Sequence, residues 1–354
     1  NIEKNIKTGG GDQVWIGSKL SNVLYLEDHF NNLVKSLKFD LSSKSEDGSK
    51  LFKELVSVAD VVVDNFSQGV TKRLGIDHQS LKKVNSKIIT CSISGFGDTE
   101  INRPAYDNLI QGYAGAMSIT GTDKDNPVKS GIPIADLGAG LYAVIGILSA
   151  IQSREKNDSG EHVDISMLDT QVSLLTYMAT MHFLSGENPE PIGNQHMNHV
   201  PFNSYRTSDG FIQIGVVAED FWPSLIEALD LRQLDTEENK LRIGRLKNRE
   251  NIDKALQEVF ITNSTEHWLK ILQEHRVPCG PINTLSETFQ DVDLLKRNII
   301  VEVLQDSGTS VKMPGNPVKI SNHNEEFRRS PKLGEHTSEV FKSWLDKDIS
   351  VDQD

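Results

Sequence analysis

The feature that most limits the folds open to this chain is a long uncharged segment that begins with an aspartate. No charged residue occurs between Asp136 and Arg154. Large apolar residues recur in this segment at spacings of three and four, namely Leu141, Val144, Ile145 and Leu148. That period predicts an α-helix, and the lack of charge predicts that the helix is buried on nearly all sides. Such a helix belongs in the interior of a layered protein.

Asp136 itself has two interpretations. An aspartate at the start of a helix is most often an N-cap, whose side chain accepts amide protons of the first turn and is kept ionised by the helix dipole. The second interpretation is that Asp136 is a nucleophile. Gly138 and Gly140 favour it, because they leave the first turn almost bare and let a ligand or another backbone approach closely. Since glycine also costs helix stability, its presence needs a reason. Cap and nucleophile are both open at this point.

Length and charge restrict the class of protein. A chain of 354 residues exceeds the size at which single cores usually stop growing, so two domains are expected. The net charge of -13 argues against nucleic acid as a partner. Cys91 and Cys279 are too few for a disulfide framework or a cysteine metal site, which favours a reducing compartment. We expect a cytoplasmic protein without a membrane segment or signal peptide, with the mitochondrial matrix as the alternative.

The first half of the chain alternates between strand and helix patterns, as α/β domains do. The predicted strands are residues 61–63, 88–93 and 163–166, and the predicted helices are residues 51–58, 80–84 and 168–184. The glycine-containing residues 94–97 follow the second strand. A ligand loop is expected there, outside the carboxyl end of a parallel strand.

The composition changes near residue 190, where residues 187–191 have the pattern of a linker. Beyond it, a strand pattern covers residues 211–216, and helix patterns cover residues 221–229, 252–259 and 266–274. We therefore predict a large domain over residues 1–190, a small α+β domain over residues 200–295, and a return segment over residues 296–354 that completes the large domain.

Other constellations carry weaker signals. His196 and His199 form an H-x-x-H pair without a further acidic or thiolate ligand nearby, so we predict a loop that lines a cleft and no metal site. Lys72 and Arg73 follow the strand that ends near Asn65, where they could neutralise phosphates or form a solvated helix end. The sequence contains no P-loop, no G-x-S-x-G elbow and no G-x-G-x-x-G fingerprint.

Six segments carry a resemblance to a known family. They are residues 59–66 (ADVVVDNF), 92–97 (SISGFG), 103–107 (RPAYD), 134–137 (IADL), 277–283 (VPCGPIN) and 333–337 (LGEHT). In this order, over about residues 40–343, the chain resembles the family III CoA-transferases, the CaiB/BaiF group. The resemblance implies a Rossmann-like large domain built from both chain ends, a smaller α+β domain, and a homodimer of interlocked ring-like subunits.

The resemblance also implies an activity and a site. Family members move coenzyme A between an acyl-CoA and a small carboxylic acid (EC 2.8.3 type), through covalent aspartyl-CoA and anhydride intermediates and without a metal. By position, Asp136 matches the catalytic aspartate. The positions that match CoA contacts are Asn65, Phe66, Arg73, Ala105 and Tyr106. The loop of residues 193–201 is expected to help select the acid.

Two other functions stay open. The fold also serves α-methylacyl-CoA racemases, but these have a histidine where this chain has Tyr106, and a neutral tyrosine is a poor base at pH 7. A non-catalytic relative with a degraded CoA pocket is the second alternative. It is suggested by three departures: the family's first strand–helix unit is missing before residues 7–12, residues 31–36 replace a basic tract, and Ser67-Gln68 replace an arginine or a Gly-Pro pair.

Overall fold

The computed structural model describes residues 15–16, 37, 46–101, 103–322, 325 and 327–348. Residues 7–12 and 31–36, which carry two of the departures from the family pattern, lie outside the described residues. Contacts divide the chain into two compact units. Unit 1 comprises Asn1–Ala116, Lys129–Glu187 and Asn298–Asp354, and unit 2 comprises Met117–Val128 and Asn188–Arg297.

Unit 1 contains a four-stranded sheet in the order β1-β2-β3-β4. Its strands are β1 (Trp15–Ile16), β2 (Val61–Asp64), β3 (Ile89–Ser94) and β4 (His162–Ser166). The last three are parallel, and β1 pairs antiparallel with β2. The three strands predicted from the sequence in this region are confirmed. Since β2, β3 and β4 run in one direction, their carboxyl ends meet at one edge of the sheet.

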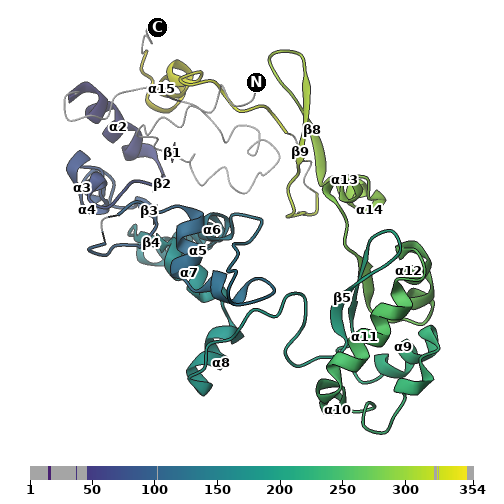
Figure 1. Ribbon diagram of the computed structural model, residues 1–354. Coiled ribbons are helices and arrows are strands. Elements are labelled where there is room, and N and C mark those ends of the chain that lie inside the picture. Colours follow the sequence, from purple (N-terminus) through teal and green to yellow (C-terminus); the bar gives the residue numbers. More distant parts are fainter. Residues whose placement is uncertain are drawn as a thin grey trace. The chain divides into compact units, whose positions relative to one another are not determined.

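Helices accompany this sheet (Figure 1). They are α2 (Glu46–Val58), α3 (Val70–Leu74), α4 (His78–Lys82), α5 (Asp107–Tyr113), α6 (Ile134–Asn157), α7 (Met167–Leu174), α8 (Tyr177–Ser185) and α15 (Thr337–Leu345). Leu55 of α2 is fully buried against Val340 and Phe341 of α15. Residues near the C-terminal end therefore help to build unit 1. The antiparallel pair β8 (Ile300–Leu304) and β9 (Ser310–Pro314) also belongs to it.

The prediction of one long helix over residues 168–184 is wrong. The segment folds as α7 and α8, which are separated at Thr176. Thr176 has a φ of 49°, in the left-handed region that a β-branched residue rarely adopts. No proline or glycine occurs between residues 168 and 184, so the sequence carries no signal for this break.

The prediction that α6 is buried on nearly all sides is also wrong. Its buried apolar residues are small ones: Ala135, Gly138, Ala139, Ala143 and Ala150. A Cβ added at Gly146 would lie 2.6 Å from Cγ1 of Val163, so this face packs directly on β4. The large apolar side chains point the other way. Leu141, Val144, Ile145 and Leu148 are each between 55% and 67% exposed.

Among the described helices, α6 is the one whose length and apolar composition would allow it to cross a membrane. It also packs against β3, β4, α5 and α7 of unit 1. The small residues on its inner face serve this packing, as the contact of Gly146 with β4 shows.

Unit 2 contains a three-stranded antiparallel sheet in the order β5-β6-β7. Its strands are β5 (Phe202–Arg206), β6 (Phe211–Gly215) and β7 (Cys279–Pro281). Its helices are α9 (Phe221–Leu229), α10 (Arg242–Lys247), α11 (Arg249–Phe260), α12 (Thr265–Glu274), α13 (Leu285–Thr288) and α14 (Val292–Lys296). The strand and three helices predicted here are confirmed. Trp222, Phe260 and Trp268 form the centre of the core.

Candidate active site

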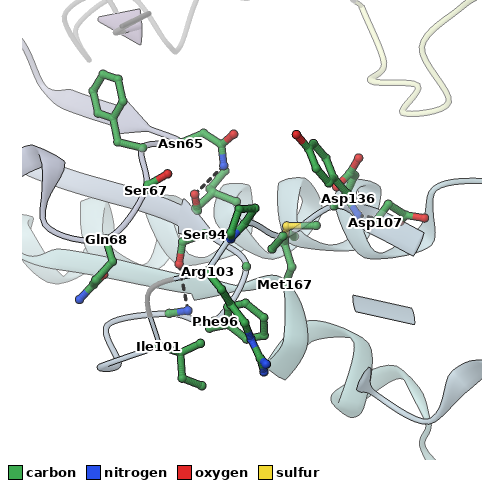
Figure 2. Close-up of a pocket in the computed structure, with 18 of the residues that line it drawn as sticks. Asn65, Ser67, Gln68, Ser94, Phe96, Ile101, Arg103, Asp107, Asp136 and Met167 are labelled. Carbon is green, nitrogen blue, oxygen red and sulfur yellow. Dashed lines mark hydrogen bonds between the residues drawn. The ribbon is translucent and has the colours of Figure 1, made fainter. Parts of the chain in front are cut away.

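A cavity of about 450 Å³ opens in unit 1, where β2 and β3 end (Figure 2). Residues after β2 form one wall, and residues 93–97 at the end of β3 form the next. Ile101, residues 103–107 and the first two turns of α6 complete the cavity, together with Met167. All of these residues belong to unit 1. The fold therefore gathers five separate chain segments around one space, at the edge of the sheet where a ligand loop was expected.

Five of the six site residues predicted from the sequence line this cavity. They are Asn65, Phe66, Ala105, Tyr106 and Asp136. The sixth, Arg73, lies on α3, is exposed, and is not part of the lining. Its neighbour Lys72 lines an adjacent cavity of about 290 Å³. The two cavities share Phe66, Ser67, Gln68, Ser94 and Gly97.

Asp136 is not the cap of α6. The helix begins at Ile134, so Asp136 lies within the first turn, and the capping carboxylate comes from Asp107 on α5. One Asp107 oxygen, Oδ1, accepts the backbone N–H of Ala135 at 2.8 Å and that of Asp136 at 3.3 Å. The Asp136 side chain has no hydrogen bond or ion pair with any residue that the structure describes, and it is exposed to the cavity. The cap interpretation is therefore wrong for Asp136.

The electrostatic surroundings raise the pKa of Asp136. Partial burial is the larger cause, and the negative charge of Asp107 adds to it, because both disfavour the ionised form. This direction is opposite to the one expected from the helix dipole alone. A more basic carboxylate oxygen is also a better nucleophile, so the surroundings suit Asp136 to attack a carbonyl carbon.

Asp107 fixes the start of α6 through a short network. Its second oxygen, Oδ2, accepts a hydrogen bond from Nε2 of Gln111 at 2.6 Å. Oε1 of Gln111 accepts the backbone N–H of Ser130 at 2.8 Å, and Gln111 is almost fully buried. Sequence reasoning did not select Asp107 as a site residue. The available signal was its place in the RPAYD segment at the beginning of a short helix.

Glycines allow these segments to approach each other. A Cβ at Gly95 would lie 2.1 Å from Cβ of Ala105, so only glycine lets Ala105 pack on the end of β3. The two glycines of α6 differ. A Cβ at Gly138 would lie 2.9 Å from Cγ2 of Thr170 on α7, whereas one at Gly140 would meet nothing within 4 Å. Gly138 serves helix packing, and Gly140 leaves the cavity wall open.

The residues that follow β2 lie on the cavity wall. Asn65 donates a hydrogen bond from Nδ2 to the backbone oxygen of Ile93 at 2.6 Å, which ties the end of β2 to β3. Ser67 and Gln68, which depart from the family pattern, lie on the cavity wall. Nε2 of Gln68 donates to Oδ1 of Asp98 at 3.0 Å. Gln68 therefore makes a polar contact at the cavity wall.

The histidines of the loop at residues 193–201 belong to unit 2. The rings of His196 and His199 lie 4.7 Å apart, and His196 also contacts the ring of Phe202. Within the described part of the chain, no group of three histidine, cysteine or acidic side chains is arranged to hold a metal ion.

Comparison with known proteins identifies the family of the chain. Residues 27–337 match the family described as CoA-transferase family III. The chain is 32% identical over 338 residues to the succinate–glutarate CoA-transferase of Agrobacterium fabrum, an alignment that covers 92% of this chain and 81% of that one. It is 31% identical over 306 residues to the human succinyl-CoA:glutarate CoA-transferase, with 85% and 70% covered.

A solved structure shows the same fold. The crystal structure of a CaiB/BaiF family protein from Brucella suis superposes with a TM-score of 0.76 at 32% identity, over 88% of this chain and 81% of that one. The family match spans most of the sequence and includes every segment that lines the cavity. The chain thus belongs to family III of the CoA-transferases, the CaiB/BaiF family, and is an enzyme of that type.

Proposed function

We propose that this enzyme moves coenzyme A between an acyl-CoA and a small carboxylic acid, with Asp136 as the covalent nucleophile. The observation that carries the proposal is the division of work between two aspartates. Asp107 caps α6, and Asp136 is left without a partner among the described residues, at the wall of the cavity. This freedom favours attack, because hydrogen bonds from capping N–H groups would stabilise the carboxylate's charge and make it a weaker nucleophile.

The transfer of CoA from the donor to the acceptor acid takes four steps. An Asp136 oxygen attacks the thioester carbonyl, a C–O bond forms, the C–S bond breaks, and CoA leaves as a thiolate. The thiolate then attacks the aspartyl carbonyl of the mixed anhydride, which releases the donor acid and leaves an aspartyl-CoA thioester. The acceptor carboxylate attacks this thioester and again expels the thiolate. Finally, the thiolate attacks the acceptor's carbonyl, so that the new acyl-CoA forms and Asp136 is free again.

The other predicted site residues form two groups according to whether they line the cavity. Asn65, Phe66, Ala105 and Tyr106 share the cavity with Asp136, so we assign them to the part of CoA nearest the reacting thioester. Arg73 lies outside the lining and is exposed, which leaves it the outer, phosphate-bearing part of CoA. Unit 1 then acts as the CoA-binding domain. The loop of residues 193–201 belongs to unit 2 and is proposed to influence the choice of acid.

The acids are proposed to be small carboxylates of the kind named for the relatives. Those names include succinate and glutarate for the Agrobacterium fabrum protein and oxalate for an acetyl-CoA:oxalate CoA-transferase of Acetobacter aceti, which is 32% identical over 310 residues, with 86% of this chain and 78% of that one covered. A dicarboxylate offers one carboxylate for reaction and one for recognition.

A homodimer is proposed from the exposed face of α6. We define the α6 strip as Leu137, Leu141, Val144, Ile145 and Leu148, which recur at helical spacing and are each more than half exposed. Small residues face the sheet and large apolar residues face outward, the reverse of a helix that covers a monomer. A continuous apolar strip of this kind is typical of a protein interface. The family resemblance assigns its partner as a second copy of the chain.

Trapping the covalent intermediate tests the catalytic proposal. The protein is incubated with succinyl-CoA or acetyl-CoA and then with hydroxylamine, which converts an aspartyl thioester or anhydride to a hydroxamate. Peptide mass spectrometry is expected to find the modification at Asp136, and to find none in Asp136→Asn. If no acyl-CoA from a panel gives an adduct and calorimetry detects no CoA binding, the chain is a non-catalytic relative. Exchange of an α-proton without acyl transfer would instead favour the racemase chemistry.

A further inference from the structure

We propose that Arg103 forms an oxyanion-binding subsite in the Asp136 cavity, which takes a phosphate or a free carboxylate of the substrate. This inference rests on the proposed function, since it assigns part of the substrate to a residue of the same cavity. Arg103 lines the cavity and was not selected as a site residue from the sequence.

Two aromatic rings hold the guanidinium group in place. Cζ of Arg103 lies 4.8 Å from the ring centre of Phe96 and 4.3 Å from that of Tyr113. The two rings meet edge to face, with their centres 5.8 Å apart. Stacking of this kind orients a guanidinium group but uses none of its five N–H donors.

The donors of Arg103 are not used elsewhere in the described part of the chain. Other arginines pair with carboxylates: Arg154 with Asp60 at 2.9 Å, and Arg245 with Glu219 at 2.7 Å. Arg103 has no hydrogen bond or ion pair with a described residue, although Asp107 and Asp136 line the same cavity. An oriented, unpaired guanidinium on a cavity wall is suited to bind the oxygen atoms of a carboxylate or phosphate side by side.

Its position separates it from the reacting carboxylate. Figure 2 shows the Arg103 side chain extending away from Asp136. Asp107, which binds the backbone of Asp136, is the first residue of α5, and Tyr113, which stacks on Arg103, is the last. Six residues of helix correspond to about 9 Å. The subsite therefore binds a charged group of the substrate at some distance from the carbonyl under attack.

The charges of the protein and its substrates explain why an anion-binding subsite is useful. The chain carries a net charge of -13, and acyl-CoA and carboxylate substrates are anions, so the protein's own field opposes their approach. Arg103 is the one cationic side chain among the described residues that line the cavity. The adjacent cavity has Lys72, but it also has Asp64, Asp77, Asp98 and Asp164. An anion is better accommodated beside Arg103.

Kinetics of Arg103→Met and Arg103→Lys test the inference and identify the anion. The control is Arg206→Met, which removes another exposed, ring-stacked arginine, 5.5 Å from the ring centre of Phe211 in unit 2. S-acetylpantetheine, which lacks every phosphate of acetyl-CoA, tests the phosphate. With acetyl-CoA as donor, propionate compared with succinate as acceptor tests the second carboxylate.

The expected result is a loss of about 10- to 100-fold in kcat/KM for Arg103→Met, partly restored in Arg103→Lys, and confined to the substrates that carry the recognised anion. A loss with acetyl-CoA but not with S-acetylpantetheine assigns a phosphate. A loss with succinate but not with propionate assigns a carboxylate. An unchanged kcat/KM, or an equal loss with every substrate, overturns the inference.

Binding in an inactive background separates this inference from the proposed reaction. Calorimetry with Asp136→Ala and with Asp136→Ala/Arg103→Met measures the affinity for acetyl-CoA and for succinate without turnover. Weaker binding of either ligand in the double variant supports the subsite even if the covalent mechanism fails. Equal binding in both proteins, or no binding to either, overturns it.

Discussion

The carboxylate of Asp107 accepts the backbone N–H of Asp136 at 3.3 Å, and the side chain of Asp136 has no described partner of its own. One aspartate thus does the capping that the sequence suggested for the other. Partial burial raises the pKa of Asp136, and the nearby negative charge of Asp107 raises it further, because two negative charges disfavour each other. A helix terminus can therefore present a free carboxylate without losing its cap.

Asp107→Asn tests this electrostatic coupling. The amide keeps an oxygen for the cap but removes the negative charge, so the pKa of Asp136 is expected to fall. Since Asp136 reacts as the carboxylate, activity is lost as the pH drops through its pKa, and the acid limb of the kcat/KM profile should move to lower pH. Asp107→Ala also removes the cap, at a cost of about 1 kcal/mol in unfolding free energy. An unmoved acid limb in Asp107→Asn would contradict the coupling.

Asp136→Asn is expected to lower the rate of acyl transfer by about 1000-fold or more. The same substitution is expected to raise the thermal stability of the protein. The folded pKa of Asp136 lies above its ordinary value, so the folded state favours the protonated form more than the unfolded chain does. At neutral pH the ionised carboxylate therefore lowers stability, and the amide removes this effect. The gain in Tm should shrink as the pH falls through the raised folded pKa of Asp136 and should vanish below about 4, where both states bind the proton. Differential scanning calorimetry from acid to neutral pH measures it, and a gain that grows toward low pH would contradict the sign.

The two glycines of α6 give a matched pair of variants. Gly138→Ala places a methyl group 2.9 Å from Cγ2 of Thr170, so overpacking should cost about 1–3 kcal/mol in unfolding free energy. Gly140→Ala meets open space and should gain about 0.5–1 kcal/mol from helix propensity. Because Gly140 lines the cavity, its methyl group is expected to raise the KM for acyl-CoA. Chemical denaturation and steady-state kinetics measure both effects, and equal stability changes would be the contrary result.

A charged substitution tests whether the α6 strip is the dimer interface. Ile145→Glu places a carboxylate in the middle of the strip, at a position that is 58% exposed in the single chain. If the strip binds a second copy, the variant should sediment as a monomer while the original chain sediments as a dimer. Leu304→Glu on β8, where the leucine is 64% exposed, is the control for an exposed leucine outside the strip. Identical sedimentation of Ile145→Glu and the original chain would rule out this strip as the interface.

The sequence predicted β2, β3 and β4 of unit 1, and β6, α9, α11 and α12 of unit 2, because alternation and turn residues are local signals. It did not predict the break at Thr176, which no glycine or proline marks. It also misjudged the burial of α6, since a lack of charge does not tell whether an apolar face meets the chain's own sheet or is left exposed. Composition shows that a helix is apolar, but tertiary packing determines which of its faces is buried.

By itself, the sequence determined the family, the order of its elements and the position of Asp136 at the start of a long helix. Only the tertiary structure decided that Asp107 is the cap, that Arg73 lies outside the cavity, and that Arg103 stacks unpaired on its wall. The physical reason is that these outcomes depend on distances between chain segments that are far apart in sequence. A carboxylate's role depends on which amide protons lie within reach of its oxygen atoms, and folding sets that distance.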